Sequence, residues 1–191
     1  MEKSRIIMVE GPQGVGKTTL VEYLRENIPC CDLYRLSGIK DKSKLGLEKN
    51  IKRYDALLSY MENSANTGID MVFDRCFASE QVYSSLGFKD YDFTSVFEQL
   101  TKRFDALDYD IYYINLYIND QTVYQKRIER DHHHNYIAFS MQNCINQQAA
   151  YKKVSDYFKT YKNIKVYDIA TDDFKAAYNQ INSLLGINIK N

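Results

Sequence analysis

The sequence predicts a three-layer α/β/α fold built on a five-stranded, mainly parallel sheet. Short apolar runs bounded by turn residues alternate along the chain with segments whose apolar residues recur at helical spacing. Alternation of strands and helices is typical of parallel sheets whose two faces are both covered by helices. Ligands bind such sheets at the carboxyl ends of the strands, so we expect functional residues there.

Five segments have the composition of buried strands: residues 5–10, 30–36, 69–74, 109–118 and 164–169. The stretch from Ile111 to Ile118 lacks strict alternation of apolar and polar residues, which indicates a strand covered on both faces. Cys30 and Cys31 open the second segment, and we expect both to be buried as small apolar side chains.

Three stretches repeat their apolar residues at the helical period: residues 20–28, 51–61 and 174–185. We expect Asp172 or Thr171 to cap the last of these helices, because short polar side chains accept hydrogen bonds from the first free N–H groups. The chain has 191 residues and neither an internal repeat nor a Pro-, Ser- or Gly-rich linker. The sequence therefore predicts one domain.

Charge and hydropathy argue against several classes of protein. Lys plus Arg equal Asp plus Glu, at 25 each, so no overall charge draws the chain to nucleic acid or to a membrane surface. No apolar run approaches the ~18–20 residues of a membrane span, and the run near the start is too short for a signal peptide. The four cysteines show no metal-site or disulfide spacing. We expect a soluble cytoplasmic protein that binds neither nucleic acid nor membranes.

The stretch VEGPQGVGKTTL, residues 9–20, holds the clearest motif of the chain. From Gly11 to Thr18 it reads G-x-x-x-x-G-K-T, the spacing of the phosphate-binding loop (P-loop) of ATP and GTP enzymes. Its glycines let successive N–H groups point at phosphate oxygens, and the following helix adds its positive N-terminal end. The candidate ATP-binding residues are Gly11, Gly14, Val15, Gly16, Lys17, Thr18 and Thr19.

A magnesium site is predicted from two separate segments. Thr18 would supply a hydroxyl ligand to Mg²⁺, and a supporting carboxylate is expected at the end of another apolar strand. Asp74, in the sequence MVFDR, meets that expectation. Arg75 follows it directly, and a second charge at the same strand end indicates phosphate chemistry. The expected cofactor is Mg²⁺, with ATP as the phosphate donor.

The block DRCFASEQVY, residues 74–83, resembles the D-R-x-x-x-S-x-x-x-Y stretch of thymidylate kinases, which are P-loop nucleoside monophosphate kinases. Arg53 precedes Arg75 by 22 positions, the separation expected in that family for the arginine that grips the acceptor's phosphate. YQKRIERD (124–131) is similar to the family's short basic lid, and VYDIATDDFKAAYNQI (166–181) to its last strand, adenine-contacting loop and closing helix.

The resemblance implies a P-loop kinase fold with a short lid, in which one nucleotide kinase domain spans residues 1–191. It places the acceptor-binding region at about 37–106 and the lid at about 124–140. The activity it implies is ATP-dependent phosphorylation of a deoxynucleoside monophosphate, dTMP or a related pyrimidine, to the diphosphate. Related kinases often form dimers through helices beside the acceptor site. The sequence leaves both a monomer and a homodimer as alternatives.

A monophosphate acceptor also fits the chemistry of the side chains. Its ionised phosphate oxygen is the nucleophile, so it needs a clamp of arginines and no general base. Arg53 and Arg75 offer that clamp with bidentate geometry, and Arg35 is a third candidate contact. The full set of candidate acceptor-binding residues is Gln13, Arg35, Arg53, Arg75, Ser79, Tyr83 and Phe97.

Positive charge at the transferred phosphoryl group is expected from the P-loop lysine and from the lid. Gly14 occupies the place of a P-loop arginine, so Arg127 and Arg130, three residues apart on one helical face, would supply that charge. An exposed basic helix end is the alternative interpretation of this pair. The candidate catalytic residues are Lys17, Arg75, Arg127 and Arg130.

Other patterns leave alternatives open. Phe97 either stacks on the base or belongs to the core, and Tyr83 packs either beside the deoxyribose or against the sheet. Gln13 stands where the family usually has an acid, which leaves the selectivity for deoxyribose open. The run DHHHN at 131–135 favours a solvated lid loop over a metal site, because consecutive histidines cannot all face one ion.

Two other functions remain as alternatives. A deoxynucleoside kinase needs a carboxylate to take the proton of the 5′-hydroxyl. The segment after the second strand, RLSGIKDKSK, offers only Asp41 for that role. A non-catalytic ATP-binding regulatory module would bind ATP without accelerated transfer to any small acceptor.

Overall fold

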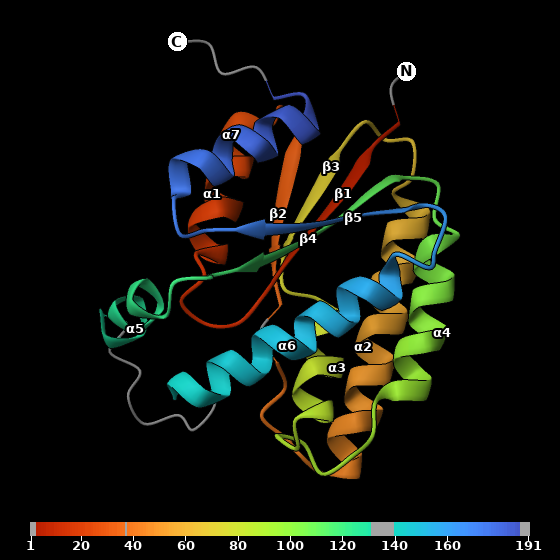
Figure 1. Cartoon of the computed structure of the whole chain (residues 1–191). Coiled ribbons are helices and arrows are strands. Elements are labelled where there is room, and N and C mark those ends of the chain that lie inside the picture. Colours follow the sequence, from red (N-terminus) through yellow and green to blue (C-terminus); the bar gives the residue numbers. More distant parts are fainter. Residues whose placement is uncertain (1–2, 37, 131–139, 188–191) are drawn as a thin grey trace.

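The computed structural model describes residues 3–36, 38–130 and 140–187. A five-stranded sheet with the order β2-β3-β1-β4-β5 forms its centre (Figure 1). All four pairs of neighbouring strands are parallel, which confirms the predicted α/β class. The strands are β1 (Arg5–Glu10), β2 (Cys31–Arg35), β3 (Asp70–Asp74), β4 (Asp110–Tyr117) and β5 (Ile164–Ala170).

Helices cover both faces of the sheet, so the predicted three layers are present (Figure 1). One face carries α1 and α7, and the other carries α2, α3, α4 and α6, while α5 lies beside the P-loop. Among the described residues, no helix is both long and apolar enough to cross a membrane. The helices are α1 (Lys17–Asn27), α2 (Lys44–Asn63), α3 (Phe77–Ser85), α4 (Thr94–Asp105), α5 (Gln121–Arg130), α6 (Met141–Phe158) and α7 (Phe174–Leu185).

The central strand shows why the apolar runs lack alternation. Ile6 and Met8 enter the apolar cluster under α2, α3, α4 and α6, whereas Ile7 and Val9 enter the cluster under α1 and α7. All four side chains are fully buried. A strand between two helical layers needs apolar residues on both of its faces.

Two local expectations are corrected by the structure. Cys31 is buried in β2 as expected, but Cys30 is exposed, because it forms the turn before the strand with a φ of 52°. The cap of α7 is Asp173, whose carboxylate accepts the N–H groups of Lys175 and Ala176. Asp172 instead accepts N–H groups from the segment that leads into α5.

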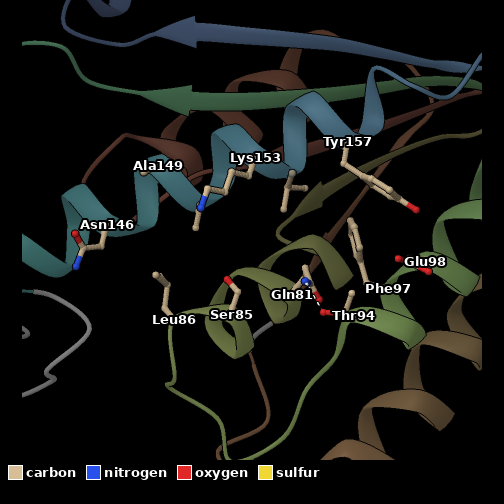
Figure 2. Close-up of a pocket in the computed structure, with 12 residues that line it drawn as sticks. Gln81, Ser85, Leu86, Thr94, Phe97, Glu98, Asn146, Ala149, Lys153 and Tyr157 are labelled. Atoms are coloured by element: carbon tan, nitrogen blue, oxygen red, sulfur yellow. Dashed lines mark hydrogen bonds between the residues drawn. The ribbon is translucent and has the colours of Figure 1, made fainter.

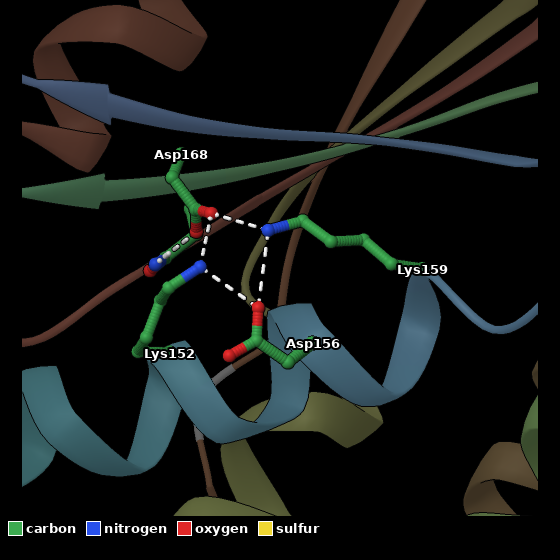
Figure 3. A network of polar contacts seen from close by, with 5 residues as sticks. Lys152, Asp156, Lys159 and Asp168 are labelled. Carbon is green, nitrogen blue, oxygen red and sulfur yellow. Dashed lines mark hydrogen bonds and ion pairs between the residues drawn. The ribbon is translucent and has the colours of Figure 1, made fainter.

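A polar network ties α6 to the edge of the sheet (Figure 3). Asp168 of β5 accepts hydrogen bonds from Lys152 of α6 at 2.8 Å and from Lys159, the residue that follows α6, at 2.9 Å. Its other oxygen accepts the amide of Asn115 of β4 at 2.9 Å. Asp156 pairs with the same two lysines. These contacts hold α6 against β4 and β5, on the face of the sheet opposite α1.

Candidate active site

The P-loop connects β1 to α1 in the expected way. Gly11 and Gly16 have φ angles of 137° and 91°, which only glycine adopts readily. A Cβ at Gly11 would lie 2.4 Å from the carbonyl oxygen of Leu116, and one at Gly16 would lie 2.3 Å from the ring of Phe174. Both glycines are therefore required by the backbone conformation and by close neighbours.

Lys17 lies inside this loop. Its Nζ donates a hydrogen bond to the carbonyl oxygen of Pro12 at 2.6 Å. Burial holds the pKa of Lys17 well below its ordinary value. The side chain thus lies where phosphate oxygens would sit against the loop, and a bound polyanion would favour its charged form.

The two predicted magnesium ligands meet in the structure. The hydroxyl of Thr18 donates a hydrogen bond to Oδ2 of Asp74 at 3.1 Å, although 56 positions separate them in the chain. One hydroxyl and one carboxylate, with water and phosphate oxygens, form the kind of oxygen site that Mg²⁺ occupies in nucleotide enzymes. No group of three or more acidic, His or Cys residues is arranged for a metal in the ranges that the structure describes. The donor set therefore fits magnesium bound together with a nucleotide.

A cleft of about 590 Å³ opens above the P-loop. The carboxyl ends of β2 and β3 contribute Arg35, Asp74 and Arg75 to its lining, and the other walls include Arg130 and Phe174. Gln13 also lines it. The cleft therefore combines the P-loop, the candidate magnesium ligands and three arginines.

Arg75 has an unusual conformation for a residue with a side chain. Its φ is 68°, in the left-handed region, and its N–H donates to the carbonyl oxygen of Val9. Nη1 donates to the hydroxyls of Ser79 at 3.1 Å and Tyr151 at 2.7 Å. The guanidinium lies over the ring of Tyr83, 5.8 Å from its centre. Such locally strained backbone is common where a side chain must be aimed at a ligand.

Glu10, the last residue of β1, is a site residue that the sequence analysis missed. Its carboxylate is fully buried and accepts hydrogen bonds from the N–H of Cys76 and the hydroxyl of Ser79, both at 2.6 Å. Burial raises the pKa of Glu10 to about 7, against the opposing effect of Arg75. The available signal was an acidic residue ending an apolar strand, directly before the first P-loop glycine.

The other predicted acceptor arginines lie on separate elements. Arg35 forms an exposed ion pair with Glu22 of α1 at the edge of the cleft. Arg53 is on α2, where its guanidinium lies over the ring of Tyr54, 5.7 Å from the centre. The cleft lining includes Arg35 and Arg75 but not Arg53.

The two candidate lid arginines have different surroundings. Arg130 lines the cleft. Arg127 donates to the carbonyl oxygen of Thr171 at 2.6 Å, and its guanidinium lies 4.2 Å from the centre of the Phe174 ring. The structure therefore brings Arg127 to the segment between β5 and α7 and beside Gly14 of the P-loop, while its guanidinium is held by Thr171 and Phe174. The DHHHN run of the predicted lid lies outside the described residues.

Phe97 is not brought to the P-loop cleft. It is 4% exposed and packs against the rings of Phe77, Tyr157 and Phe158. One edge of its ring lines a second cavity of about 450 Å³ between α3, α4 and α6 (Figure 2). This environment agrees with the core interpretation of Phe97.

Comparisons with known proteins find similarity only among solved structures; no protein-family model and no curated protein matches the chain. The structure of the YorR protein from Bacillus subtilis, in complex with phosphorylated GDP, is 18% identical with a TM-score of 0.65, over 94% of this chain and 95% of that chain. Thymidylate kinase from Candida albicans is 14% identical with a TM-score of 0.61, over 99% and 96%. Deoxyadenosine kinase from M. mycoides with bound dATP is 15% identical with a TM-score of 0.61, over 96% and 99%.

At these identities the similarity shows the fold, which is that of P-loop kinase-like α/β proteins. The strand order places β1 and the P-loop at the centre, next to β3 with Asp74 and Arg75. The fold thus accounts for the position of the cleft.

Proposed function

We propose that this protein is an ATP-dependent kinase that phosphorylates a deoxynucleoside monophosphate, dTMP or a related pyrimidine nucleotide, to the diphosphate. The observation that carries this proposal is the cleft itself. It brings the P-loop, the Thr18–Asp74 pair and two acceptor-side arginines, Arg35 and Arg75, to one space. One cleft therefore offers groups for a donor triphosphate and for an acceptor phosphate.

On the donor side, the P-loop N–H groups and Lys17 would bind the triphosphate. Thr18 and Asp74 would hold Mg²⁺, which neutralises charge on the phosphates when bound. Phe174 and Arg127, stacked beside the P-loop, offer a flat surface for the adenine. Arg130 would add positive charge beside the transferred group.

On the acceptor side, Arg75 would hold the monophosphate with Arg35 and Arg53, and Gln13 would face the sugar. A monophosphate needs no general base. Asp74 is the only acidic side chain that lines the cleft within the described ranges, and it contacts Thr18. That arrangement favours a monophosphate over a nucleoside, whose 5′-hydroxyl requires a base.

The second candidate is a deoxynucleoside kinase. The specific observation in its favour is that the M. mycoides deoxyadenosine kinase and the C. albicans thymidylate kinase match this chain with the same TM-score, 0.61. The fold alone therefore does not separate a nucleoside from a nucleotide acceptor.

The deciding experiment is ADP release from ATP and Mg²⁺ against a matched panel of dTMP, dUMP, dCMP, dGMP, dAMP, UMP and the corresponding nucleosides. Arg53→Ala tests the acceptor clamp, and Lys52→Ala, an exposed neighbour on α2, is its control. We expect turnover with monophosphates that falls at least tenfold in Arg53→Ala alone, since a charged hydrogen bond is worth about 1.5–3 kcal/mol. Turnover with nucleosides only would support the second candidate, and ATP binding without any turnover would indicate a regulatory module.

A further inference from the structure

Arg75 is held by a buried chain of hydrogen bonds drawn from four segments of the fold. Nη1 of Arg75 donates to the hydroxyl of Tyr151 at 2.7 Å and to that of Ser79 at 3.1 Å. The hydroxyls of Tyr151 and Ser79 lie 2.7 Å apart, and Ser79 donates to Glu10 at 2.6 Å. Tyr151 comes from α6, Ser79 from α3 and Glu10 from β1.

When Glu10 is ionised, the hydrogen bonds of this network have one consistent direction. Because Ser79 gives its only hydroxyl hydrogen to Glu10, it must accept from both Arg75 and Tyr151. Tyr151 therefore accepts from Arg75 and donates to Ser79. The hydroxyls of Ser79 and Tyr151 thus each donate and accept hydrogen bonds. Buried polar groups are stable only when they have such partners.

The hydroxyl of Tyr151 is the polar group of this hydrogen-bond network that stands out, because it lies on a side chain of the apolar core. Its side chain is fully buried in the apolar cluster under α3 and α6. A phenylalanine would fill the same space with the same apolar contacts. The hydroxyl is thus present in a position where packing alone does not need it, and it meets the guanidinium that reaches the cleft.

We propose that Tyr151 is a positioning residue of the acceptor site, which acts through Arg75. Its hydroxyl, with Ser79, holds one end of the guanidinium, so that the remaining N–H groups are available to the phosphate of the acceptor. This inference rests on the proposed function, in which Arg75 binds that phosphate. It connects α6, a helix outside the cleft, to recognition of the acceptor.

The kinetic test compares Tyr151→Phe with Tyr109→Phe. Tyr109 is a suitable control because its hydroxyl, on a side chain that is also buried, donates to the carbonyl oxygen of Met61 at 2.9 Å, at the opposite end of the sheet from Arg75. We expect Tyr151→Phe to raise the KM for the best monophosphate roughly tenfold or more, since it removes a hydrogen bond to a charged group. The KM for ATP should stay within about twofold in both variants, and Tyr109→Phe should leave the acceptor KM within the same range. Equal changes in both KM values, or an unchanged acceptor KM, would overturn the proposal.

A second measurement needs no substrate. In protein labelled with ¹⁵N-arginine, a guanidinium held at one end shows separate Nη signals because its rotation is slow, and Arg75→Lys assigns those of Arg75. We expect separate signals in the unaltered protein and in Tyr109→Phe, and averaged signals in Tyr151→Phe. Unchanged Arg75 signals in Tyr151→Phe would refute the positioning role. Absence of turnover by the unaltered protein would instead refute the proposed function, while this spectrum still decides the role of Tyr151.

Discussion

Glu10 shows how a single residue can combine structural and electrostatic roles at this site. Its carboxylate receives two hydrogen bonds and lies near the positive charges of Arg75 and Lys17, yet burial dominates and raises its pKa to about 7. The folded protein therefore retains a proton on Glu10 that the unfolded chain has already released above its ordinary value of 4.5. Folding is then linked to proton binding in that interval.

From this linkage we predict that the free energy of unfolding falls as the pH rises from about 4.5 to about 7, because the unfolded state binds fewer protons there. Glu10→Gln removes the titrating group and should flatten this part of the profile. Urea unfolding at intervals between about pH 4 and pH 8 measures it. Glu26→Gln, an exposed glutamate of α1, is the control and should keep the slope. A slope unchanged in Glu10→Gln would contradict the prediction.

The contact between Thr18 and Asp74 leads to a second prediction at the residue scale. Thr18→Val keeps the shape of the side chain but removes the hydroxyl that is 3.1 Å from Asp74. We expect the Mg²⁺ concentration for half-maximal activity to rise about tenfold or more, because one of few protein oxygens is lost. Thr18→Ser restores the hydroxyl and should restore most of the affinity. A Mg²⁺ requirement that is equal in all three proteins would argue against this metal site.

At the scale of elements, α7 connects its own helix cap to the P-loop side of the cleft. The helix begins at Phe174, which packs against Gly16 and under the guanidinium of Arg127. Its first free N–H groups are capped by Asp173. Any change at the cap therefore acts on the residue that borders the P-loop.

We predict that Asp173→Ala lowers the free energy of unfolding by about 1 kcal/mol, the usual effect of losing an N-cap side chain. Asp173→Asn should be nearly neutral, because its amide oxygen can accept the same hydrogen bonds. Chemical denaturation of the three proteins measures the difference. Equal losses in both variants would indicate that the charge matters more than the cap.

At the scale of the whole molecule, α6 joins the sheet edge to the centre of the site. Its outer side is held by the Asp168 network, and its inner side carries Tyr151. Burial would raise the pKa of Asp168, but hydrogen bonds from Asn115, Lys152 and Lys159 hold it well below its ordinary value. The network is therefore most stabilising while this carboxylate is charged.

The resulting prediction concerns acid stability. A carboxylate with a lowered pKa contributes stability above its unfolded value of about 3.8, and this contribution is lost as the pH falls below that value. Asp168→Asn should therefore be less stable than the unaltered protein at pH 7, and the difference in the free energy of unfolding should shrink progressively as the pH falls below about 3.8. Denaturation at several pH values measures this trend. A difference that is constant with pH would contradict it.

Much of this structure could be predicted from short patterns in the sequence, because the backbone conformation of a loop or strand depends largely on residues that are close together along the chain. The P-loop spacing sets the backbone at Gly11 and Gly16. The apolar runs identified all five strands to within about two residues, since burial on two faces leaves a clear composition. The contact between Thr18 and Asp74 was also predictable, because the carboxyl ends of parallel strands meet at one edge of the sheet.

Side-chain partners across elements were not predictable in the same way. Phe97 and Arg127 have suitable chemistry for the roles expected of them, but a helical period shows only that one face is buried. Which neighbour each face meets depends on how the helices pack, and this packing brings Phe97 to the rings around α6 and Arg127 to Phe174. Tyr151 gave no local signal, since an apolar position on α6 accepts Tyr or Phe equally.

The sequence by itself therefore determined the α/β class and the P-loop, and it identified the candidate magnesium ligands Thr18 and Asp74, which are in contact in the structure. The tertiary structure alone decided that Glu10, Ser79 and Tyr151 surround Arg75, from positions up to 141 residues apart. The physical reason is that backbone conformation follows from neighbours along the chain, whereas a buried polar group finds its partner only when separate elements pack together.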